Sequence, residues 1–279
     1  MQKSKIDLYA YFREKVPEGR KGGFLHGWQH GDESGIGIKK RPAVLIFPGG
    51  GYEFICKRER EAVALEYYGH GFDAFVLDYD VAPLHYPTQI VQAGMAMLYL
   101  RREEKALNLN DKIAALGFSA GGHLCGCISF LWDDPALSDR FGNECEKIRP
   151  DAAVLSYPVV TSDKKYISHK GSFDNFCGDA VSPQGYSLEN KVRSSAPPCF
   201  LWANAEDACV PVENSLLLYE ALISSGVSAE IHIFEKGGHG WSLCNEEVLK
   251  GITPAVKHAR RWVQMSVEFL GGHGFCPEP

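Results

Sequence analysis

Short apolar runs alternate with segments of helical periodicity through most of this chain of 279 residues. Such runs suit strands that are buried on both faces, and the segments between them are long enough for crossover helices. The alternation predicts an α/β fold with a mostly parallel central sheet and helices on both faces. The expected strands are 42–47, 74–77, 113–116, 153–155, 199–202 and 230–234, and the expected helices are 57–70, 88–105, 120–131, 213–225 and 255–270. The first 40 residues could add antiparallel strands.

One long segment interrupts this alternation. Residues 160–196 are polar, rich in Ser, Asp, Gly and Tyr, and show no clear period. A connection of this length inside a compact domain is usually functional or a lid rather than a simple loop. A chain of this size can bury a single large core. We therefore expect one α/β domain over residues 1–279, with an insertion or small cap at about 160–196.

Charge and composition argue against several classes of partner. The formal net charge of −6 disfavours nucleic acid or an anionic membrane as the main partner. No apolar run approaches the roughly 18 residues of a membrane span, and the N-terminal residues lack the apolar core of a signal peptide. The chain is therefore expected in the cytoplasm. Its nine cysteines are scattered and form no C-x-x-C pair, so we expect reduced structural thiols and no metal site.

The segment Gly117-Phe118-Ser119-Ala120-Gly121 joins an expected strand to an expected helix. A sharp strand-to-helix turn strains its central residue and leaves no room for side chains two positions before and after it. Gly117 and Gly121 meet that requirement, and the turn would lift the Ser119 hydroxyl out of the sheet, with the amides of the helix N-terminus directed toward it. The pattern alone is weak, because a chain with 29 glycines contains it by chance in about one case in five. Its position between strand and helix makes Ser119 a candidate nucleophile.

A nucleophilic serine needs a base and a carboxylate that orients the base. His239 follows the last expected strand within a glycine-rich loop, and Asp207 follows the strand before it. Taken singly, His239 could be a surface-loop histidine, Asp207 could cap a turn, and Glu206 is a rival carboxylate. Open parallel sheets, however, place active sites at the carboxyl ends of their strands. The three residues each follow their own strand in an order, Ser then Asp then His, that is typical of one class of serine hydrolases, so together they predict a catalytic triad.

Three consecutive glycines follow the first expected strand, within residues 48–52. They could form a flexible turn, and a phosphate cradle is disfavoured because no Lys-Ser or Lys-Thr pair follows as in a P-loop. The functional interpretation is an oxyanion hole, since glycines let backbone amides face the oxygen that becomes negative in a tetrahedral intermediate. The amide of Ala120 would contribute to the same hole.

Together these motifs resemble the esterase/lipase group of the α/β-hydrolase superfamily over about residues 41–241. More narrowly, the chain is similar to the bacterial carbohydrate-ester hydrolases called acetyl-xylan esterase-like or BD-FAE-like. The resemblance rests on Phe47-Pro-Gly-Gly-Gly-Tyr52, Gly117-Phe-Ser-Ala-Gly-Gly-His123, Pro198-Cys-Phe-Leu-Trp202, Asp207-x-x-Val210-Pro211, Val212-Glu-Asn-Ser-Leu216 and Phe234-Glu-Lys-Gly-Gly-His-Gly240. It implies an α/β-hydrolase fold.

The resemblance also implies roles for the matching residues. Ser119 would be the nucleophile, Asp207 the orienting acid and His239 the base. The carboxylate that stands three residues before Val-Pro is Asp207, so the resemblance favours it over Glu206.

In the HGGG motif of related proteins the second and third glycines face the oxyanion, and here these are Gly50 and Gly51. Two positions depart from the pattern. Pro48 replaces the histidine of that motif, as in many carbohydrate esterases, and Asp80 stands where relatives usually carry an arginine. No salt bridge is therefore carried over at Asp80, while the catalytic residues are unaffected.

The leading hypothesis is a serine carboxylester hydrolase that removes acetyl groups from short oligosaccharides through an acyl-enzyme, without cofactor or metal. An amide hydrolase of the peptidase or arylformamidase type would use the same machinery, and a non-catalytic protein with this fold is a third option. Tyr52 and Trp241 are candidates for substrate contacts, although packing explains each as readily. The expected partner is a small-molecule ester such as an acetylated oligosaccharide, and a homodimer is left open.

Overall fold

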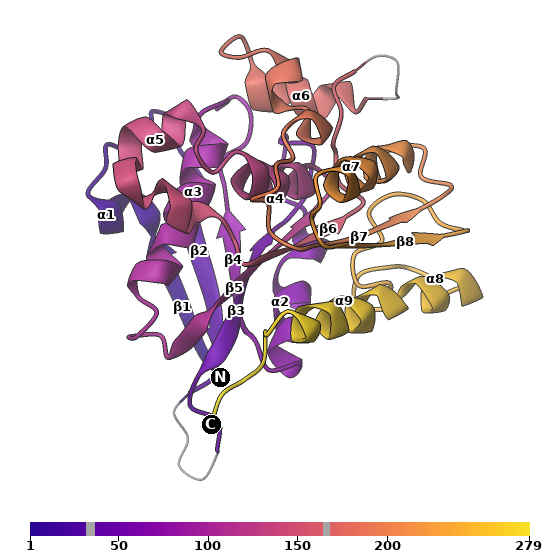
Figure 1. Ribbon diagram of the computed structural model, residues 1–279, viewed down its shortest axis with the longest axis horizontal. Coiled ribbons are helices and arrows are strands. Elements are labelled where there is room, and N and C mark those ends of the chain that lie inside the picture. The colour runs from indigo at the N-terminus through magenta and orange to yellow at the C-terminus, as the bar shows by residue number, and fades with distance from the viewer. Residues whose placement is uncertain (32–36, 164–167) are drawn as a thin grey trace.

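The computed structural model describes residues 1–31, 37–163 and 168–279, so residues 164–167 of the predicted insertion lie outside the described ones. Within these ranges eight strands form one sheet in the order β1-β2-β4-β3-β5-β6-β7-β8 (Figure 1). β1 and β2 are antiparallel to their neighbours, whereas β3 to β8 run parallel to one another. The strands are β1 Gln2–Asp7, β2 Phe24–Gln29, β3 Arg41–Phe47, β4 Asp73–Asp78, β5 Leu109–Phe118, β6 Ala152–Ser156, β7 Cys199–Asn204 and β8 Ala229–Phe234. The predicted α/β fold with a mostly parallel sheet is confirmed.

Helices cover both faces of the sheet (Figure 1). One face is covered mainly by α3 Thr88–Arg102, α4 Ala120–Phe130 and α7 Glu213–Ser224. The other is covered by α2 Glu61–Gly69, α8 Pro254–Ala259 and α9 Arg261–Gly272. The remaining helical segments are α1 Leu8–Phe12, α5 Pro135–Phe141, α6 Lys170–Cys177 and the 3-10 turns η1 Lys57–Glu59, η2 Gly142–Ile148, η3 Pro183–Tyr186 and η4 Leu188–Asn190.

Two of the expected helices are interrupted. The segment expected as 57–70 consists of η1 and α2, and the segment expected as 255–270 is divided into α8 and α9. The first break falls at Arg60, whose φ of −112° and ψ of −110° lie outside the helical region. This break separates Glu59, which is buried, from Glu61, which is exposed.

The central strands are buried on both faces. On β3, Ala43, Leu45 and Phe47 enter the apolar cluster beneath α3 and α4, while Val44 and Ile46 enter the cluster beneath α2 and α9. All five side chains are fully buried, and burying one large aliphatic side chain stabilises a fold by about 1.5–3 kcal/mol. Because both clusters are built on the same sheet, we propose that residues 1–279 form one domain.

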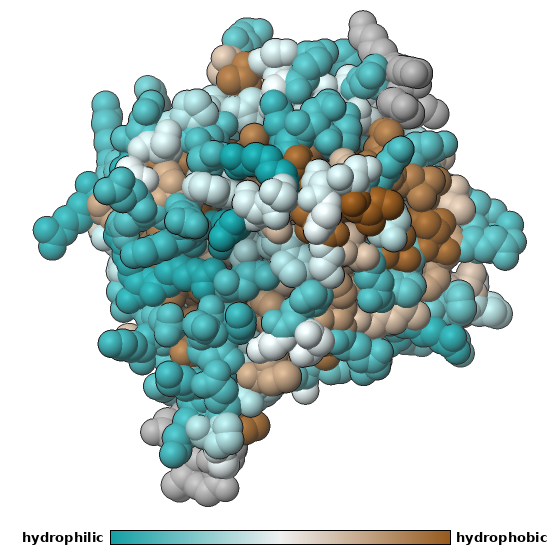
Figure 2. Space-filling view, viewed as in Figure 1, coloured by the Kyte–Doolittle hydropathy of each residue, from teal (hydrophilic) through white to brown (hydrophobic). Residues whose placement is uncertain are grey.

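The visible surface is mostly polar, with apolar side chains gathered over α7 and the edge strand β8 (Figure 2). Leu216 and Ile223 of α7 and Ile233 of β8 are exposed. None of these three residues lines the pocket described below. Among the helices that the structure describes, none is both long and apolar enough to cross a membrane.

The carboxyl ends of the parallel strands meet along one edge of the sheet, where open α/β folds bind their ligands. The chain leaves β3 into Pro48, β5 into Ser119 and β6 into Tyr157. β7 and β8 lead into the loops that carry Asp207 and His239. The helix α6 of the predicted insertion lies over this edge (Figure 1). Residues far apart in the sequence are thereby brought to one place.

Candidate active site

Ser119 occupies the turn between β5 and α4, with a φ of 52° and a ψ of −120°. Residues other than glycine rarely adopt a positive φ, so the surrounding structure must hold this strained turn. The backbone passes close to its neighbours: a Cβ on Gly117 would lie 2.3 Å from the carbonyl oxygen of Gly121. A Cβ on Gly121 would lie 2.1 Å from the carbonyl oxygen of Phe47. The two glycines therefore permit the turn that presents the Ser119 hydroxyl at the end of the sheet.

The three candidate triad residues form a continuous hydrogen-bonded chain. His239 Nε2 lies 2.8 Å from Ser119 Oγ, and His239 Nδ1 lies 2.6 Å from Asp207 Oδ2. The other oxygen of Asp207, Oδ1, accepts from the backbone amides of Cys209 and Val210, each at 2.9 Å. Because the carboxylate accepts from Nδ1–H, the tautomer with a free Nε2 is favoured, and Nε2 can take a proton from the serine.

Glu206, the rival carboxylate, does not contact His239. Its side chain is exposed and pairs with Lys236 at 2.7 Å, and it also accepts from the backbone amide of Gly237 at 3.3 Å. The hydrogen bond from Lys236 lowers the pKa of Glu206. Asp207, by contrast, has a side chain that is only 1% exposed. The geometry places Asp207, and not Glu206, beside the candidate base.

The segment 48–52, here called the glycine loop, leaves two backbone amides free beside Ser119. The carbonyl oxygens of its three glycines accept, in order, from Cys56 N at 2.9 Å, Phe54 N at 3.1 Å and Asn175 Nδ2 at 2.9 Å. Gly50 has a φ of 124° and Gly51 a φ of 64°, which glycine adopts readily. Within the described residues the amides of Gly50, Gly51 and Ala120 have no acceptor. These three donors are therefore available to an oxygen bound at this point.

A buried carboxylate connects the glycine loop to the loop that carries His239. Glu59 is 2% exposed; its Oε2 accepts from the amide of Gly49 at 2.8 Å and its Oε1 from the hydroxyl of Tyr157 at 2.7 Å. The Tyr157 oxygen in turn accepts from the amide of Ser242 at 2.9 Å, and its ring packs edge-on against His239 with centroids 5.0 Å apart. Both carboxylate oxygens accept, as suits the ionised form, although burial raises the pKa of Glu59. Glu59 thus holds the two loops in position.

Glu59→Gln tests this connection. A glutamine oxygen can replace only one acceptor, so either the Gly49 amide or the Tyr157 hydroxyl loses its partner. An unpaired buried donor costs about 1–3 kcal/mol, so we expect the free energy of unfolding to fall by that amount and kcat to fall more than KM changes. Urea unfolding and steady-state kinetics measure these effects. Glu61→Gln, at an exposed position nearby, is the control, and identical behaviour of the two variants would contradict the role of Glu59.

A pocket of about 260 Å³ opens beside Ser119. It is lined by Gly50, Gly51, Glu53, Phe54, Cys56, Arg58, Glu59, Ser119, His169, Cys209, His239 and Gly240. Phe54, which is 57% exposed, gives the pocket an apolar wall. Among the described residues, no group of three or more His, Cys, Asp or Glu side chains is arranged to hold a metal ion. The pocket therefore combines the serine, the histidine and the free amides in a small space.

Tyr52 and Trp241, the two candidates for substrate contacts, do not line this pocket. Tyr52 has a φ of 55° and is fully buried, with its hydroxyl 2.8 Å from His123 Nδ1. Burial lowers the pKa of His123 to about 4, so this imidazole is neutral. The ring of Trp241 lies against Gly237, where an added Cβ would be 2.7 Å away. Both aromatic side chains pack against the protein, which favours the packing alternative over a substrate contact.

The helix α6 is attached directly to the glycine loop. Asn175 Nδ2 donates to the carbonyl oxygen of Gly51 at 2.9 Å, and the Asn175 carbonyl accepts from His85 Nδ1 at 2.7 Å. The ring of Phe176 packs against Tyr52 with centroids 5.1 Å apart. At the start of the helix, His169 is the N-cap residue and also lines the pocket. The described part of the insertion is thus one wall of the candidate site.

Sequence reasoning missed Glu59 and His169. Glu59 stands in the charged run 57–61, which is typical of a solvated helix face. Only the break at Arg60 and the contacts beyond it bury this carboxylate. His169 lies in the polar, aperiodic insertion, where no local pattern separates a residue in a pocket wall from one in a surface loop.

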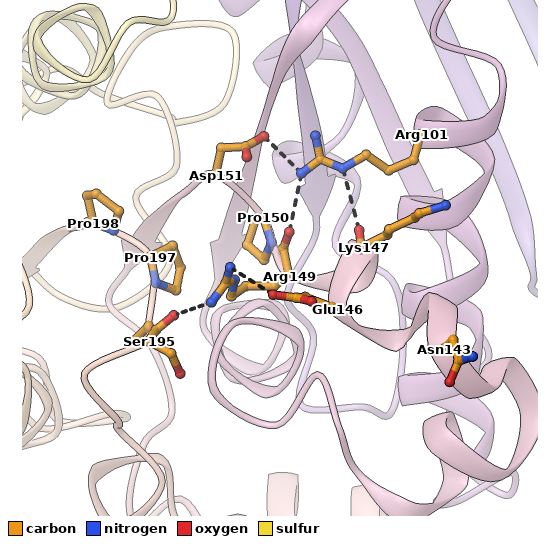
Figure 3. A pocket seen from close by; sticks show the side chains of 11 residues that line it. Arg101, Asn143, Glu146, Lys147, Arg149, Pro150, Asp151, Ser195, Pro197 and Pro198 are labelled. Carbon is orange, nitrogen blue, oxygen red and sulfur yellow. Dashed lines mark hydrogen bonds and ion pairs between the residues drawn. The ribbon is translucent and has the colours of Figure 1, made fainter.

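A second hollow, of about 500 Å³, lies at the opposite ends of the strands (Figure 3). Pro150 and Asp151 border it just before β6, and Pro197 and Pro198 border it just before β7. The guanidinium of Arg101 pairs with Asp151 at 2.8 Å and donates to backbone carbonyl groups around it. Because open α/β sheets bind substrates at the carboxyl ends of their strands, this hollow is not the candidate active site.

Comparisons with known proteins group this chain with one family. Residues 36–222 match the BD-FAE family. Endo-1,4-beta-xylanase B of Butyrivibrio fibrisolvens is 34% identical over 241 residues, which cover 81% of this chain and 36% of that protein. The acetylxylan esterase of Xylanibacter ruminicola is 30% identical over 209 residues, which cover 71% of this chain and 41% of that protein. The chain thus spans less than half the length of these two relatives.

Among solved structures, the crystal structure of an acetyl ester-xyloside bifunctional hydrolase from Caldicellulosiruptor lactoaceticus is 35% identical to this chain. The TM-score is 0.78, and the match covers 90% of this chain and 88% of that chain. The segment that matches the family, residues 36–222, includes the glycine loop, Ser119 and Asp207. The chain belongs to the BD-FAE family and has the α/β-hydrolase fold.

Proposed function

We propose that this protein is a serine carboxylester hydrolase that works through an acyl-enzyme and acts on short-chain acetyl esters of carbohydrates. The observation that carries the proposal is the chain of hydrogen bonds from Ser119 through His239 to Asp207 at the carboxyl edge of the sheet. Such a chain activates a hydroxyl that is otherwise a weak nucleophile.

In the first half of the reaction, Ser119 Oγ attacks the ester carbonyl while His239 Nε2 takes its proton. Asp207 orients the imidazole and stabilises the imidazolium that forms. The amides of Gly50, Gly51 and Ala120 would donate to the oxygen that becomes negative, and removing one such donor typically raises the barrier by about 2.7–4 kcal/mol. His239 then protonates the leaving alcohol, and the acyl group remains on the serine.

In the second half, water attacks the acyl-enzyme with His239 again acting as the base. The carboxylic acid leaves and the serine hydroxyl is restored. The turn at Ser119 and the free amides act in both halves of the reaction, because each half passes through a tetrahedral intermediate with its negative oxygen at the same place.

The size of the pocket and the relatives support a small acyl group on a sugar. Its volume of about 260 Å³ lies just below the usual range of about 300–1,000 Å³ for ligand pockets. Two of the similar proteins are an acetylxylan esterase and an acetyl ester-xyloside bifunctional hydrolase. We therefore propose acetylated xylo-oligosaccharides as the substrate class.

A panel of substrates tests this proposal. The purified chain is assayed with p-nitrophenyl acetate, butyrate and octanoate, with acetylated xylo-oligosaccharides, and with N-formylkynurenine and aminoacyl p-nitroanilides. We expect kcat/KM to be highest for the acetyl esters and to fall as the acyl chain lengthens. Activity confined to the amides would replace the esterase with an amide hydrolase, and no turnover of any substrate would favour a non-catalytic protein.

A further inference from the structure

The tautomer of His169 is determined by the helix that it caps. Its Nδ1 accepts from the backbone amide of Ser172 at 3.2 Å, and the Ser172 hydroxyl lies 2.8 Å from the same nitrogen. A backbone amide can only donate, so Nδ1 carries no proton. Burial lowers the pKa of His169, and the nearby His239 lowers it further, which keeps the ring neutral. The single ring proton is therefore on Nε2, which is a donor.

This donor is held next to the candidate reaction centre. His169 lines the same pocket as Ser119 and His239, and its Cε1 lies 3.9 Å from the position that a Cβ on Gly51 would take. The hydrogen bond from Asn175 to the Gly51 carbonyl fixes α6 to the glycine loop. Within the part of the chain that the structure describes, Nε2 of His169 has no acceptor. A polar group is thus positioned, and left unpaired, beside the proposed oxyanion donors.

We propose that His169 binds substrate: its Nε2–H donates to a hydroxyl, ring or glycosidic oxygen of the alcohol part, close to the scissile ester bond. This inference rests on the proposed ester hydrolysis and extends it by naming a residue that selects the alcohol. An aryl or alkyl alcohol offers no such oxygen, so His169 favours esters of polyhydroxylated alcohols. A neutral donor also suits an uncharged sugar oxygen better than a cation would, because it carries a smaller cost of removal from water.

His169→Asn is the test variant. Asparagine is a preferred N-cap residue and can accept from the Ser172 amide through its own oxygen, so α6 is preserved while the donor is withdrawn from the pocket. We compare kcat/KM for an acetylated methyl xyloside with kcat/KM for p-nitrophenyl acetate, which carries the same acyl group. Loss of one hydrogen bond predicts that the ratio of the two values falls about 3- to 10-fold. An unchanged circular dichroism spectrum and an unchanged unfolding midpoint check that the fold is retained.

Lys170→Gln, at the next position and exposed on α6, is the matched control and should leave the ratio unaltered. Binding supplies a second measurement: in the Ser119→Ala background, the Kd of the acetylated xyloside should rise by the same factor when His169 is replaced. Equal losses of kcat/KM on the two esters, with an unchanged Kd, would overturn the role of His169 while leaving the esterase intact. A wild-type chain that hydrolyses no ester would overturn the proposed function and this inference with it.

Discussion

Ser119→Ala is expected to lower kcat for p-nitrophenyl acetate by about 10⁶-fold, the loss that removal of a nucleophilic serine causes in a serine hydrolase. The substitution removes the Ser119 hydroxyl, which lies 2.8 Å from His239 Nε2 in the wild type, so no acyl-enzyme can form. The amides proposed as oxyanion donors remain, and a residual acceleration of about 10³–10⁴-fold over water is expected from them and from binding. Initial rates at saturating substrate measure the effect.

A covalent probe gives an independent reading of the same residue. An alkyl fluorophosphonate should add once to the wild-type chain and not to Ser119→Ala, as intact-mass spectrometry would record. Ser138→Ala, which alters an exposed serine of α5, is the control and should retain both turnover and labelling. Equal rates for Ser119→Ala and the wild type would refute Ser119 as the nucleophile.

Asp207→Asn is expected to lower kcat by about 10⁴-fold. The reason lies in the two backbone amides, of Cys209 and Val210, that donate to Oδ1. An asparagine must direct its oxygen to these donors, which turns its NH₂ group toward His239 Nδ1. His239 Nδ1 then becomes the acceptor of this hydrogen bond, and the ring proton moves to Nε2. His239 can therefore no longer accept the proton of Ser119. Because the shape of the side chain is unchanged, KM should change little.

Glu206→Gln is the matched control for Asp207→Asn. Glu206 is exposed and pairs with Lys236, and ion pairs between exposed side chains contribute little to stability because water screens them. We expect kcat to stay within about twofold of the wild-type value, since surface substitutions of this kind are nearly neutral. A greater loss from Glu206→Gln than from Asp207→Asn would make Glu206 the orienting acid.

The fold could be predicted because its central strands are buried on both faces. Such strands appear in the sequence as short uninterrupted apolar runs, and β3 to β8 are found where those runs stand. Helix boundaries were harder to predict. The backbone leaves the helical region at Arg60, whereas Arg260, between α8 and α9, keeps helical dihedral angles, and helical periodicity in the sequence continues across both points.

The candidate triad could be predicted because each member follows a strand of a parallel sheet, and such strand ends converge. The order of Ser119, Asp207 and His239 along the chain therefore carried spatial information. No comparable sequence pattern marks the residues that line the pocket. Tyr52 was a candidate for the pocket because it adjoins the glycines, yet its positive φ belongs to a turn that buries the ring against α4 and α6.

The sequence by itself determined the order of strands and helices, the glycines that permit the turn at Ser119, and the strand ends that carry the candidate triad. These features follow from backbone sterics and from the period of buried side chains, which are local properties. Only the tertiary structure decided which side chains near the candidate triad line the pocket. Glu59 and His169 line it while Tyr52 and Trp241 do not, because the packing of η1, α6 and the glycine loop joins segments that are far apart in the chain.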